Sequence, residues 1–245
     1  MIVMSIAGVD PSGGAGLFAD IKTFQSLGVY GTGIVTALTC QNPYEMFEME
    51  GISPNFIEEE IDSVFSSYNI EYIKTGMLYS AEIIKLVSRK IKEYDLKAIV
   101  DPVMVASSGR ALHESDIAQA FNKYLLPNSF LTTPNVLEAS TLSGIEITNE
   151  KSATEAALKI GEKTNVIITG GHLNGINTLF IDNEIKTIYQ DLIKTENLHG
   201  SGCTFSAAIV SYLALSNTLE IAIKKSLKFT YDSVKNGNHG TLIQK

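Results

Sequence analysis

The chain has 245 residues, of which 44% are hydrophobic and 19% are charged, and this balance excludes collagen-like, coiled-coil and disordered proteins. Its 19 Lys and Arg residues stand against 27 Asp and Glu residues, and the formal charge of -8 argues against binding to nucleic acid or to an anionic membrane. The two cysteines, Cys40 and Cys203, are too few for a disulfide framework or a four-cysteine zinc site, so we expect a reducing, cytoplasmic setting.

Short apolar runs predict the strands of a mostly parallel sheet. The first run, residues 1–7, is too short to cross a membrane and has no basic segment before it, so it predicts a buried strand over Ile2–Ala7. Further strands are expected at Ile34–Leu38, Tyr72–Thr75, Ala98–Asp101, Phe130–Thr132 and Val166–Thr169. The last two runs, Thr178–Ile181 and Ile185–Tyr189, are joined through Asp182-Asn183 and predict a hairpin that ends the parallel part.

Amphipathic segments between these runs predict helices on both faces of the sheet, which makes the fold class α/β. The expected helices are Ala15–Leu27, Pro54–Ser67, Ala81–Tyr94, Ser115–Tyr124, Pro134–Ser143, Glu150–Glu162, Thr204–Leu215 and Leu219–Asn236. Capping residues precede several of them, namely Ser53, Ser80, Thr133 and Thr218. Two prolines, Pro54 and Pro134, are expected at the first helical position, where the missing N–H costs nothing.

The stretch Cys40–Gly51 has the least regular pattern between elements, and it is predicted either as a plain surface connection or as a small flap over a site. No linker rich in Gly, Pro or Ser divides the chain, and no internal repeat is visible. We therefore expect residues 1–245 to form a single domain.

Glycines follow the first predicted strand, in the segment Gly8–Gly16. Glycine allows positive φ and a close approach of the backbone to a ligand, and the helix beyond favours an anion at its N-terminus. The dinucleotide pattern G-x-G-x-x-G is absent, and no lysine follows the glycines as in the phosphate loop. The segment is thus either a ligand-binding loop or merely a tight turn.

A second small-residue segment, His199–Thr204, leads into an apolar helical stretch. Backbone N–H groups at the positive end of a helix can hold a phosphoryl oxygen. Residue Cys203 would share that field, and a cysteine at a helix N-terminus has its pKa lowered towards thiolate, which suits proton removal or attack. The alternative is a glycine-rich turn with a packed cysteine, and Cys40 is expected to be core or pocket wall.

Polar residues also follow the middle strands, at the edge where open α/β sheets bind their ligands. The carboxylates of Asp101 and Glu138 are of the kind that holds Mg²⁺ beside substrate phosphates. Either could instead be a solvated charge or a cap, and the helix dipole alone would account for Glu138. The segment Thr169–His172 ends another strand, but its histidine lies in no metal-ligand spacing and is expected to have no catalytic role.

Six motifs taken together resemble one family. They are Ala7–Gly16 with Ala19–Phe24, Thr36–Asn42, Lys74–Leu78, Val100–Met104, Thr133–Glu138 and His199–Thr204, in order along residues 5–215. In this combination the chain resembles the hydroxymethylpyrimidine/phosphomethylpyrimidine kinases of thiamine biosynthesis, which belong to the ribokinase-like superfamily. The resemblance implies a three-layer α/β fold with a mostly parallel central sheet.

The resemblance further implies a kinase that uses ATP and Mg²⁺ to phosphorylate 4-amino-5-hydroxymethyl-2-methylpyrimidine and then its monophosphate at one site. By this likeness the pyrimidine is held by Asp20, Gln41 and Met77, with Gly8 and Val103 lining the pocket. A carboxamide such as that of Gln41 suits an aminopyrimidine edge, because it offers both a donor and an acceptor.

The same resemblance assigns the nucleotide end of the site. It places Asn135 and Glu138 at the phosphates and Mg²⁺, with Asp101 nearby as a second metal ligand and with Thr169 and Gly171 beside the nucleotide. Residues Gly200, Ser201, Gly202 and Cys203 would form the anion hole, and Cys203 would be the base that takes the hydroxyl proton. Related pyridoxal and sugar kinases generally carry an aspartate at that place. A homodimer is also implied.

Three positions depart from the family pattern. Many relatives have lysine where this chain has Thr169 and again in the loop that holds Ser107, where Arg110 is a possible substitute, and many have glutamine in place of Phe18. Two alternatives therefore stand beside the pyrimidine kinase. One is a pyridoxal kinase of the same superfamily, and the other is a non-catalytic pyrimidine-binding regulatory module.

Overall fold

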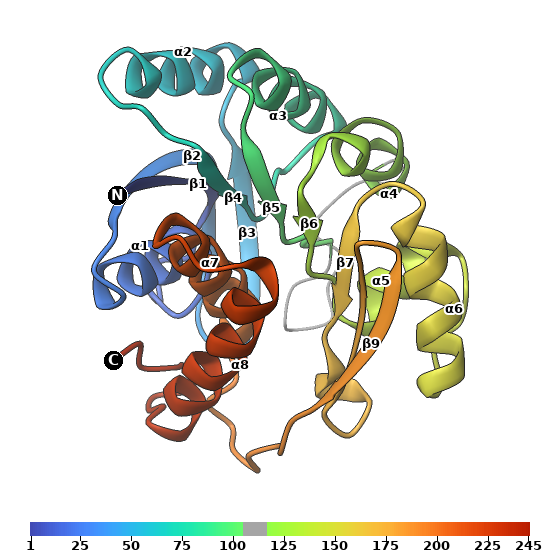
Figure 1. Ribbon diagram of the computed structural model, residues 1–245. Coiled ribbons are helices and arrows are strands. Elements are labelled where there is room, and N and C mark those ends of the chain that lie inside the picture. The colour runs from blue at the N-terminus through green and yellow to red at the C-terminus, as the bar shows by residue number, and fades with distance from the viewer. Residues whose placement is uncertain (105–116) are drawn as a thin grey trace.

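The computed structural model describes residues 1–104 and 117–245, and its strands form one nine-stranded sheet in the order β3-β2-β1-β4-β5-β6-β7-β8-β9 (Figure 1). The strands are β1 (Ile2–Val9), β2 (Tyr30–Gln41), β3 (Met46–Gly51), β4 (Tyr72–Thr75), β5 (Lys97–Val100), β6 (Leu131–Thr132), β7 (Asn165–Ile168), β8 (Ile176–Ile181) and β9 (Glu184–Tyr189). In this spatial order, all neighbouring strands from β2 to β7 pair in parallel. The pairs β2-β3, β7-β8 and β8-β9 are antiparallel. The predicted α/β class, mostly parallel sheet and terminal hairpin are confirmed.

Helices lie on both sides of this sheet, with α1, α7 and α8 on one side and the others on the opposite side (Figure 1). They are α1 (Gly16–Ser26), α2 (Pro54–Phe65), α3 (Ala81–Glu93), α4 (Ile117–Ala120), α5 (Val136–Ser143), α6 (Glu150–Gly161), α7 (Ser201–Ala214) and α8 (Leu219–Lys235). A π-helical turn, Phe121–Leu125, continues α4. None of the helices in the described ranges is both long and apolar enough to span a bilayer.

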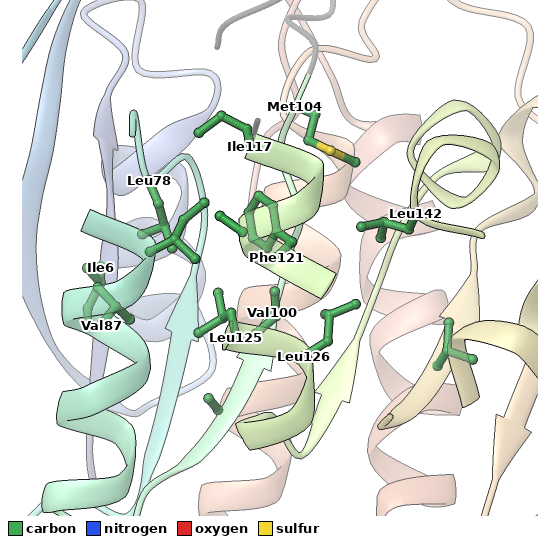
Figure 2. Packing of buried hydrophobic residues seen from close by; sticks show 14 of the residues in the cluster. Ile6, Leu78, Val87, Val100, Met104, Ile117, Phe121, Leu125, Leu126 and Leu142 are labelled. Carbon is green, nitrogen blue, oxygen red and sulfur yellow. The ribbon is translucent and has the colours of Figure 1, made fainter. Parts of the chain in front are cut away.

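Strand alternation divides the core into two main clusters. In β5, Ile99 packs with α1, α7 and α8 through residues such as Phe24 and Phe205, whereas its neighbour Val100 belongs to the cluster under α2 to α6. Figure 2 shows this second cluster, in which Val100 lies with Phe121 and Leu125 of the π-helical turn. Because both faces are covered, the central strands are mostly apolar, as is typical of a parallel sheet.

The region Cys40–Gly51 contains an antiparallel strand pair, so the prediction of an irregular connection is wrong. Strand β2 continues to Gln41, and β3 returns antiparallel to it, with Ala37 opposite Gly51 and Gln41 opposite Met46. Only Met46 of β3 is fully buried, and the glutamates at 48 and 50 are outward on an edge strand. An edge strand with so little buried surface carries a weak period-two pattern, which hid it in the sequence.

Two helix starts also differ from prediction. Helix α5 begins at Val136 with Asn135 as its N-cap, so neither Thr133 nor Pro134 has the predicted position. Helix α7 begins at Ser201, three residues before the expected Thr204, with Gly200 as N-cap. The caps at Ser53, Ser80 and Thr218 are confirmed, each by a hydrogen bond from a backbone N–H to its side chain. The start of the helix expected at Ser115 lies outside the described residues.

Candidate active site

A cavity of about 590 Å³ lies beyond the carboxyl ends of the parallel strands. It brings together every residue predicted for the site except Asp20: Gly8, Gln41, Met77, Asp101, Val103, Asn135, Glu138, Thr169, Gly171, Gly200, Ser201, Gly202 and Cys203. These residues come from strand ends, helix starts and loops spread over most of the chain, so the sheet edge is what gathers them. Their individual roles stay predictions.

The first wall of the cavity is the loop between β1 and α1. Its geometry needs glycine, because Gly16 has φ +58° and a Cβ there would lie 2.4 Å from the carbonyl oxygen of Gly8. The Asp10 carboxylate stabilises the turn by accepting hydrogen bonds from the N–H groups of Ser12 and Ala15, both at 2.8 Å. This tight turn brings Gly8 and Asp10 to the cavity surface.

The second wall is the N-terminus of α7. Gly200 has φ +91°, and a Cβ at this position would lie 1.8 Å from the carbonyl oxygen of Gly14, so the two glycine-rich loops touch. The N–H of Ser201 donates to Leu198 and that of Thr204 to Gly200. The intervening amides of Gly202 and Cys203 belong to the first turn, where a helix offers no acceptor of its own, and both residues line the cavity. This arrangement suits a phosphoryl group.

The Cys203 thiol lies in that first turn, half-buried at the cavity wall. Burial raises its pKa to about 12, while the Lys74 charge lowers it and the Asp101 charge raises it further. The expectation that the helix N-terminus would make Cys203 a ready thiolate is therefore wrong for the ligand-free protein. Loss of hydration outweighs the field of the helix, and the thiol must lose its proton before the sulfur can accept one from a substrate.

A buried charge cluster lies beside Cys203. The Nζ of Lys74 lies 2.8 Å and 2.9 Å from the two carboxylate oxygens of Asp20 and 3.9 Å from Oδ2 of Asp101. Burial lowers the pKa of Lys74, but the attraction of Asp20 outweighs it, so the pKa lies above its ordinary value. Both Lys74 and Asp20 have no exposed surface. Asp20 does not line the cavity, because its carboxylate contacts Lys74 and Ser5, and its contact with the pyrimidine stays a prediction.

The predicted metal carboxylates are both buried at the cavity. Residue Glu138 shares a capping box with Asn135, whose N–H donates to Glu138 Oε2 at 2.9 Å, so the structural role considered for it is present. Burial and the nearby Asp101 raise the pKa of Glu138 to about 8. Burial likewise raises the pKa of Asp101. Two buried carboxylates with raised pKa values at one cavity fit a divalent cation, which would neutralise both.

The described residues hold no cluster of three or more His, Cys, Asp or Glu side chains suited to a metal. This does not conflict with Mg²⁺, which is commonly bound through one or two carboxylates together with substrate phosphates and water. Residues Thr169 and Gly171 lie at the same end of the cavity, where the N–H of Thr169 donates to the carbonyl of Pro134 at 2.9 Å. Its hydroxyl offers hydrogen bonding but no charge.

Asp10 and His199 are among the cavity residues that were missing from the predicted site. The His199 Nε2 lies 2.7 Å from Asp10 Oδ2, and both side chains are buried. Burial opposes the charge on Asp10, but hydrogen bonds with His199, Gln41 and Ser12 lower the pKa of the carboxyl below its ordinary value. The pair joins residues 189 positions apart, so nothing local in the sequence could reveal it.

Comparison with known protein families gives one match, in which residues 10–243 fit the family model described as phosphomethylpyrimidine kinase. Among curated relatives, the thiamine biosynthesis bifunctional protein ThiED of Geobacter sulfurreducens is 38% identical over 239 residues, and the chain covers 49% of its length. The hydroxymethylpyrimidine/phosphomethylpyrimidine kinase of Bacillus subtilis is 38% identical over 241 residues, which are 95% of this chain and 89% of that protein.

Solved structures of two kinds of kinase share the fold. A phosphomethylpyrimidine kinase from Clostridium difficile 630 has a TM-score of 0.84 at 34% identity and covers 96% of this chain and 99% of its own. An ADP complex of a pyridoxal kinase from Bacillus subtilis has a TM-score of 0.87 at 34% identity, with 96% and 91% covered. The predicted departures at Ser107 and Arg110 lie outside the described residues, and Phe18 is 46% exposed on α1.

Proposed function

The chain belongs to the phosphomethylpyrimidine kinase family, and from this premise we propose that it transfers phosphate from ATP to 4-amino-5-hydroxymethyl-2-methylpyrimidine and then to the monophosphate, for thiamine biosynthesis. The observation that carries the proposal is the meeting of Gln41, Cys203 and the open amides of α7 in one cavity. A base, an anion-binding helix terminus and an aminopyrimidine-binding amide are the parts that such a transfer needs.

In the proposed reaction, Gln41 binds the aminopyrimidine edge while Met77, Val103 and Gly8 enclose the ring. In its thiolate form, the Cys203 sulfur accepts the proton of the substrate hydroxyl as the O–H bond breaks and the oxygen bonds to the γ-phosphorus of ATP. The bond from that phosphorus to the β–γ bridging oxygen breaks, and ADP leaves. Backbone amides of Gly202 and Cys203 stabilise the charge that builds up on the transferred group.

Nucleotide and metal are assigned to the part of the cavity that Asp101, Glu138, Asn135, Thr169 and Gly171 line. We propose that Asp101 and Glu138 hold Mg²⁺, directly or through water, and that Asn135, Thr169 and Gly171 contact the nucleotide. The metal would neutralise charge on the ATP phosphates. Since Thr169 carries no charge where many relatives have lysine, the metal and the α7 amides must supply the positive potential at the γ-phosphate, and we expect turnover to be sensitive to Mg²⁺ concentration.

The compartment, the oligomeric state and the domain organisation of the protein are also proposals. We infer a cytoplasmic homodimer whose subunit is a single domain over residues 1–245, with the sheet as the middle layer of a three-layer ribokinase-like arrangement. Low cysteine content and the absence of a disulfide between Cys40 and Cys203 support a reducing compartment.

The similarity to pyridoxal kinases keeps that activity as the second candidate, because the TM-score of 0.87 for the Bacillus subtilis enzyme is not below that of the phosphomethylpyrimidine kinase. The deciding experiment measures ADP release with MgATP and, separately, the pyrimidine alcohol, its monophosphate and pyridoxal. Faster turnover of both pyrimidines supports the proposal. Preference for pyridoxal assigns the second activity, and measurable pyrimidine binding without ADP release indicates the regulatory module.

A further inference from the structure

The side chain of His199 joins the two glycine-rich loops that form walls of the cavity. Its Nε2 lies 2.7 Å from Oδ2 of Asp10, and 189 positions separate the two residues. The same carboxylate oxygen accepts a hydrogen bond from the N–H of Ala15 at 2.8 Å. Ala15 is the N-cap of α1, and His199 directly precedes Gly200, the N-cap of α7. One oxygen atom therefore connects the starts of both helices.

Chemistry fixes the direction of the contact between His199 and Asp10. Burial opposes the charge on Asp10, but hydrogen bonds, above all the one with His199, lower the pKa of the carboxyl below its ordinary value. An ionised carboxylate only accepts hydrogen bonds, so Nε2 of His199 carries a proton and donates it to the bond. The side chains of His199 and Asp10 are 8% and 2% exposed, so water competes little for this contact.

The segment that follows His199 depends on a fixed neighbour. Gly200 and Gly202 flank Ser201, and glycine restricts the backbone less than any other residue. Gly200 also has no side chain with which to cap the helix, so the amides of the first turn of α7 are left open. Their position at the cavity therefore depends on the contacts that hold the chain just before the helix.

Packing fixes both the ring and the backbone of His199. A Cβ on Gly14 would lie 2.6 Å from Cδ2 of the ring, so the ring lies directly against the first glycine-rich loop. The backbone N–H of His199 donates to the carbonyl of Gly240 at 3.4 Å, and His199 pairs with Thr241 in a parallel bridge. The imidazole is thus held between the loop that contains Asp10 and the segment 240–241.

We infer that His199 is a positioning residue for phosphoryl transfer, whose bond to Asp10 fixes the open amides of α7 where the transferred phosphate is to bind. This inference rests on the proposed function, in which these amides stabilise the charge that builds up on the transferred group. A fixed donor stabilises that charge better than a mobile one, because it needs no reorganisation as the charge develops. Loss of the bond should then slow the transfer step and leave binding of the pyrimidine nearly unchanged.

The test compares two substitutions at His199 in steady-state ADP release. His199→Leu removes the donor, whereas His199→Gln keeps an N–H donor the same number of bonds from Cα. We expect kcat to fall by about 100-fold in His199→Leu and by about fivefold or less in His199→Gln, with KM for the pyrimidine within about threefold of the parent in both. Lys22→Met is the matched control, because Lys22 Nζ donates to the carbonyl of Gly13 at 2.7 Å and joins the same loop only to α1, and it should keep the parental kcat.

Binding of inorganic phosphate gives a readout besides activity. The backbone amide signals of Gly202 and Cys203, followed by NMR as phosphate is added, report occupation of the helix terminus. We expect half-saturation in His199→Leu to need about tenfold more phosphate than in the parent and in His199→Gln. His199→Asn, whose amide is one bond too short to reach Asp10, replaces His199→Leu if the apolar variant does not fold.

Three outcomes in the kinetics overturn the inference. Parental kcat in His199→Leu means that the amides keep their place without the bond. An equal fall in His199→Gln means that the hydrogen bond is not what matters. A fall of the same size in Lys22→Met means that any loosening of the loop has this effect.

A parent that releases no ADP with any of the three substrates refutes the proposed kinase function, and the phosphate titration then decides the inference alone. Weaker phosphate binding in His199→Leu than in His199→Gln supports it. Equal binding in the two variants, or no phosphate binding at these amides in the parent, overturns it.

Discussion

Lys74 and Asp20 form an ion pair with no exposed surface, in which one ammonium contacts both carboxylate oxygens at 2.8 and 2.9 Å. The lysine comes from β4 and the aspartate from α1, 54 residues apart. Water does not reach either group, so each charge is stabilised by its partner and not by hydration. The pair thus ties a helix to the centre of the sheet, beside Asp101 and Cys203.

Lys74→Met should destabilise the protein by about 3 to 5 kcal/mol, because it leaves the buried Asp20 carboxylate without its cation. The double variant Asp20→Asn with Lys74→Met removes both charges and should recover a large part of that loss. Urea unfolding of the single and double variants measures the effect. If the loss in free energy of unfolding of the double variant equals the sum of the losses in the two single variants, the charges do not interact as the distances indicate.

Cys203→Ala should lower kcat by about 10² to 10⁴-fold and change the KM values much less, because it removes the proton acceptor and leaves the pocket in place. The raised pKa of the thiol, about 12, has a second consequence. In the parent enzyme kcat/KM should rise with pH through the neutral range, since the thiolate fraction grows as pH approaches the pKa. Steady-state rates of both proteins test these expectations. Unchanged turnover in Cys203→Ala would show that Cys203 is not the base.

Glu138→Gln should alter how stability depends on pH in the ligand-free protein. The folded pKa of about 8 lies above the ordinary value of 4.5, so the folded state holds a proton that the unfolded state releases between these values. Stability is then lost as pH rises through this window, by about 1 kcal/mol per pH unit from this group. Glutamine keeps the capping box without the charge, so unfolding midpoints at about pH 5.5 and 7.5 should differ less in the variant. An unchanged slope would mean that Glu138 is already ionised.

Gln41→Ala should raise KM for the pyrimidine by about tenfold or more and leave KM for ATP nearly unchanged. The reason is that Gln41, at the end of β2, is proposed to bind the pyrimidine, whereas Thr169 and Glu138 are proposed to hold the nucleotide and its metal. Initial rates with each substrate varied in turn separate the two constants. A fall in ATP affinity with pyrimidine affinity intact would place Gln41 in the nucleotide half.

Local sequence patterns correctly predicted those strands and helices whose apolar residues are buried. Strand Tyr72–Thr75 was predicted to the residue, since its apolar run and its boundaries coincide. Strand β3 was missed, because an edge strand with one fully buried residue has almost no pattern to detect. The start of α5 was misplaced, because Thr133 and Asn135 are both good caps and only the bond from the Glu138 N–H to Asn135 Oδ1 decides between them.

The site was predicted as a set of motifs, but not its internal contacts. The sequence placed Asp20 in a family motif, yet its partner Lys74 lies in another motif and on another element. The pKa of Cys203 was misjudged for a similar reason: the helix terminus is visible locally, whereas the burial of the thiol comes from segments far along the chain. Asp10 and His199 are the extreme case, because desolvation and pairing arise only after folding.

The touch between Gly14 and Gly200 also bears on how the protein is made. The first of these loops leaves the ribosome early, whereas the second emerges only after about four-fifths of the chain has been synthesised. Until then the cavity lacks the helix terminus meant for phosphate, and β1 lacks the α7 surface that covers it. A nascent or truncated chain that ends before α7 therefore lacks the proposed anion hole, so we expect phosphoryl transfer to begin only after this segment has been made.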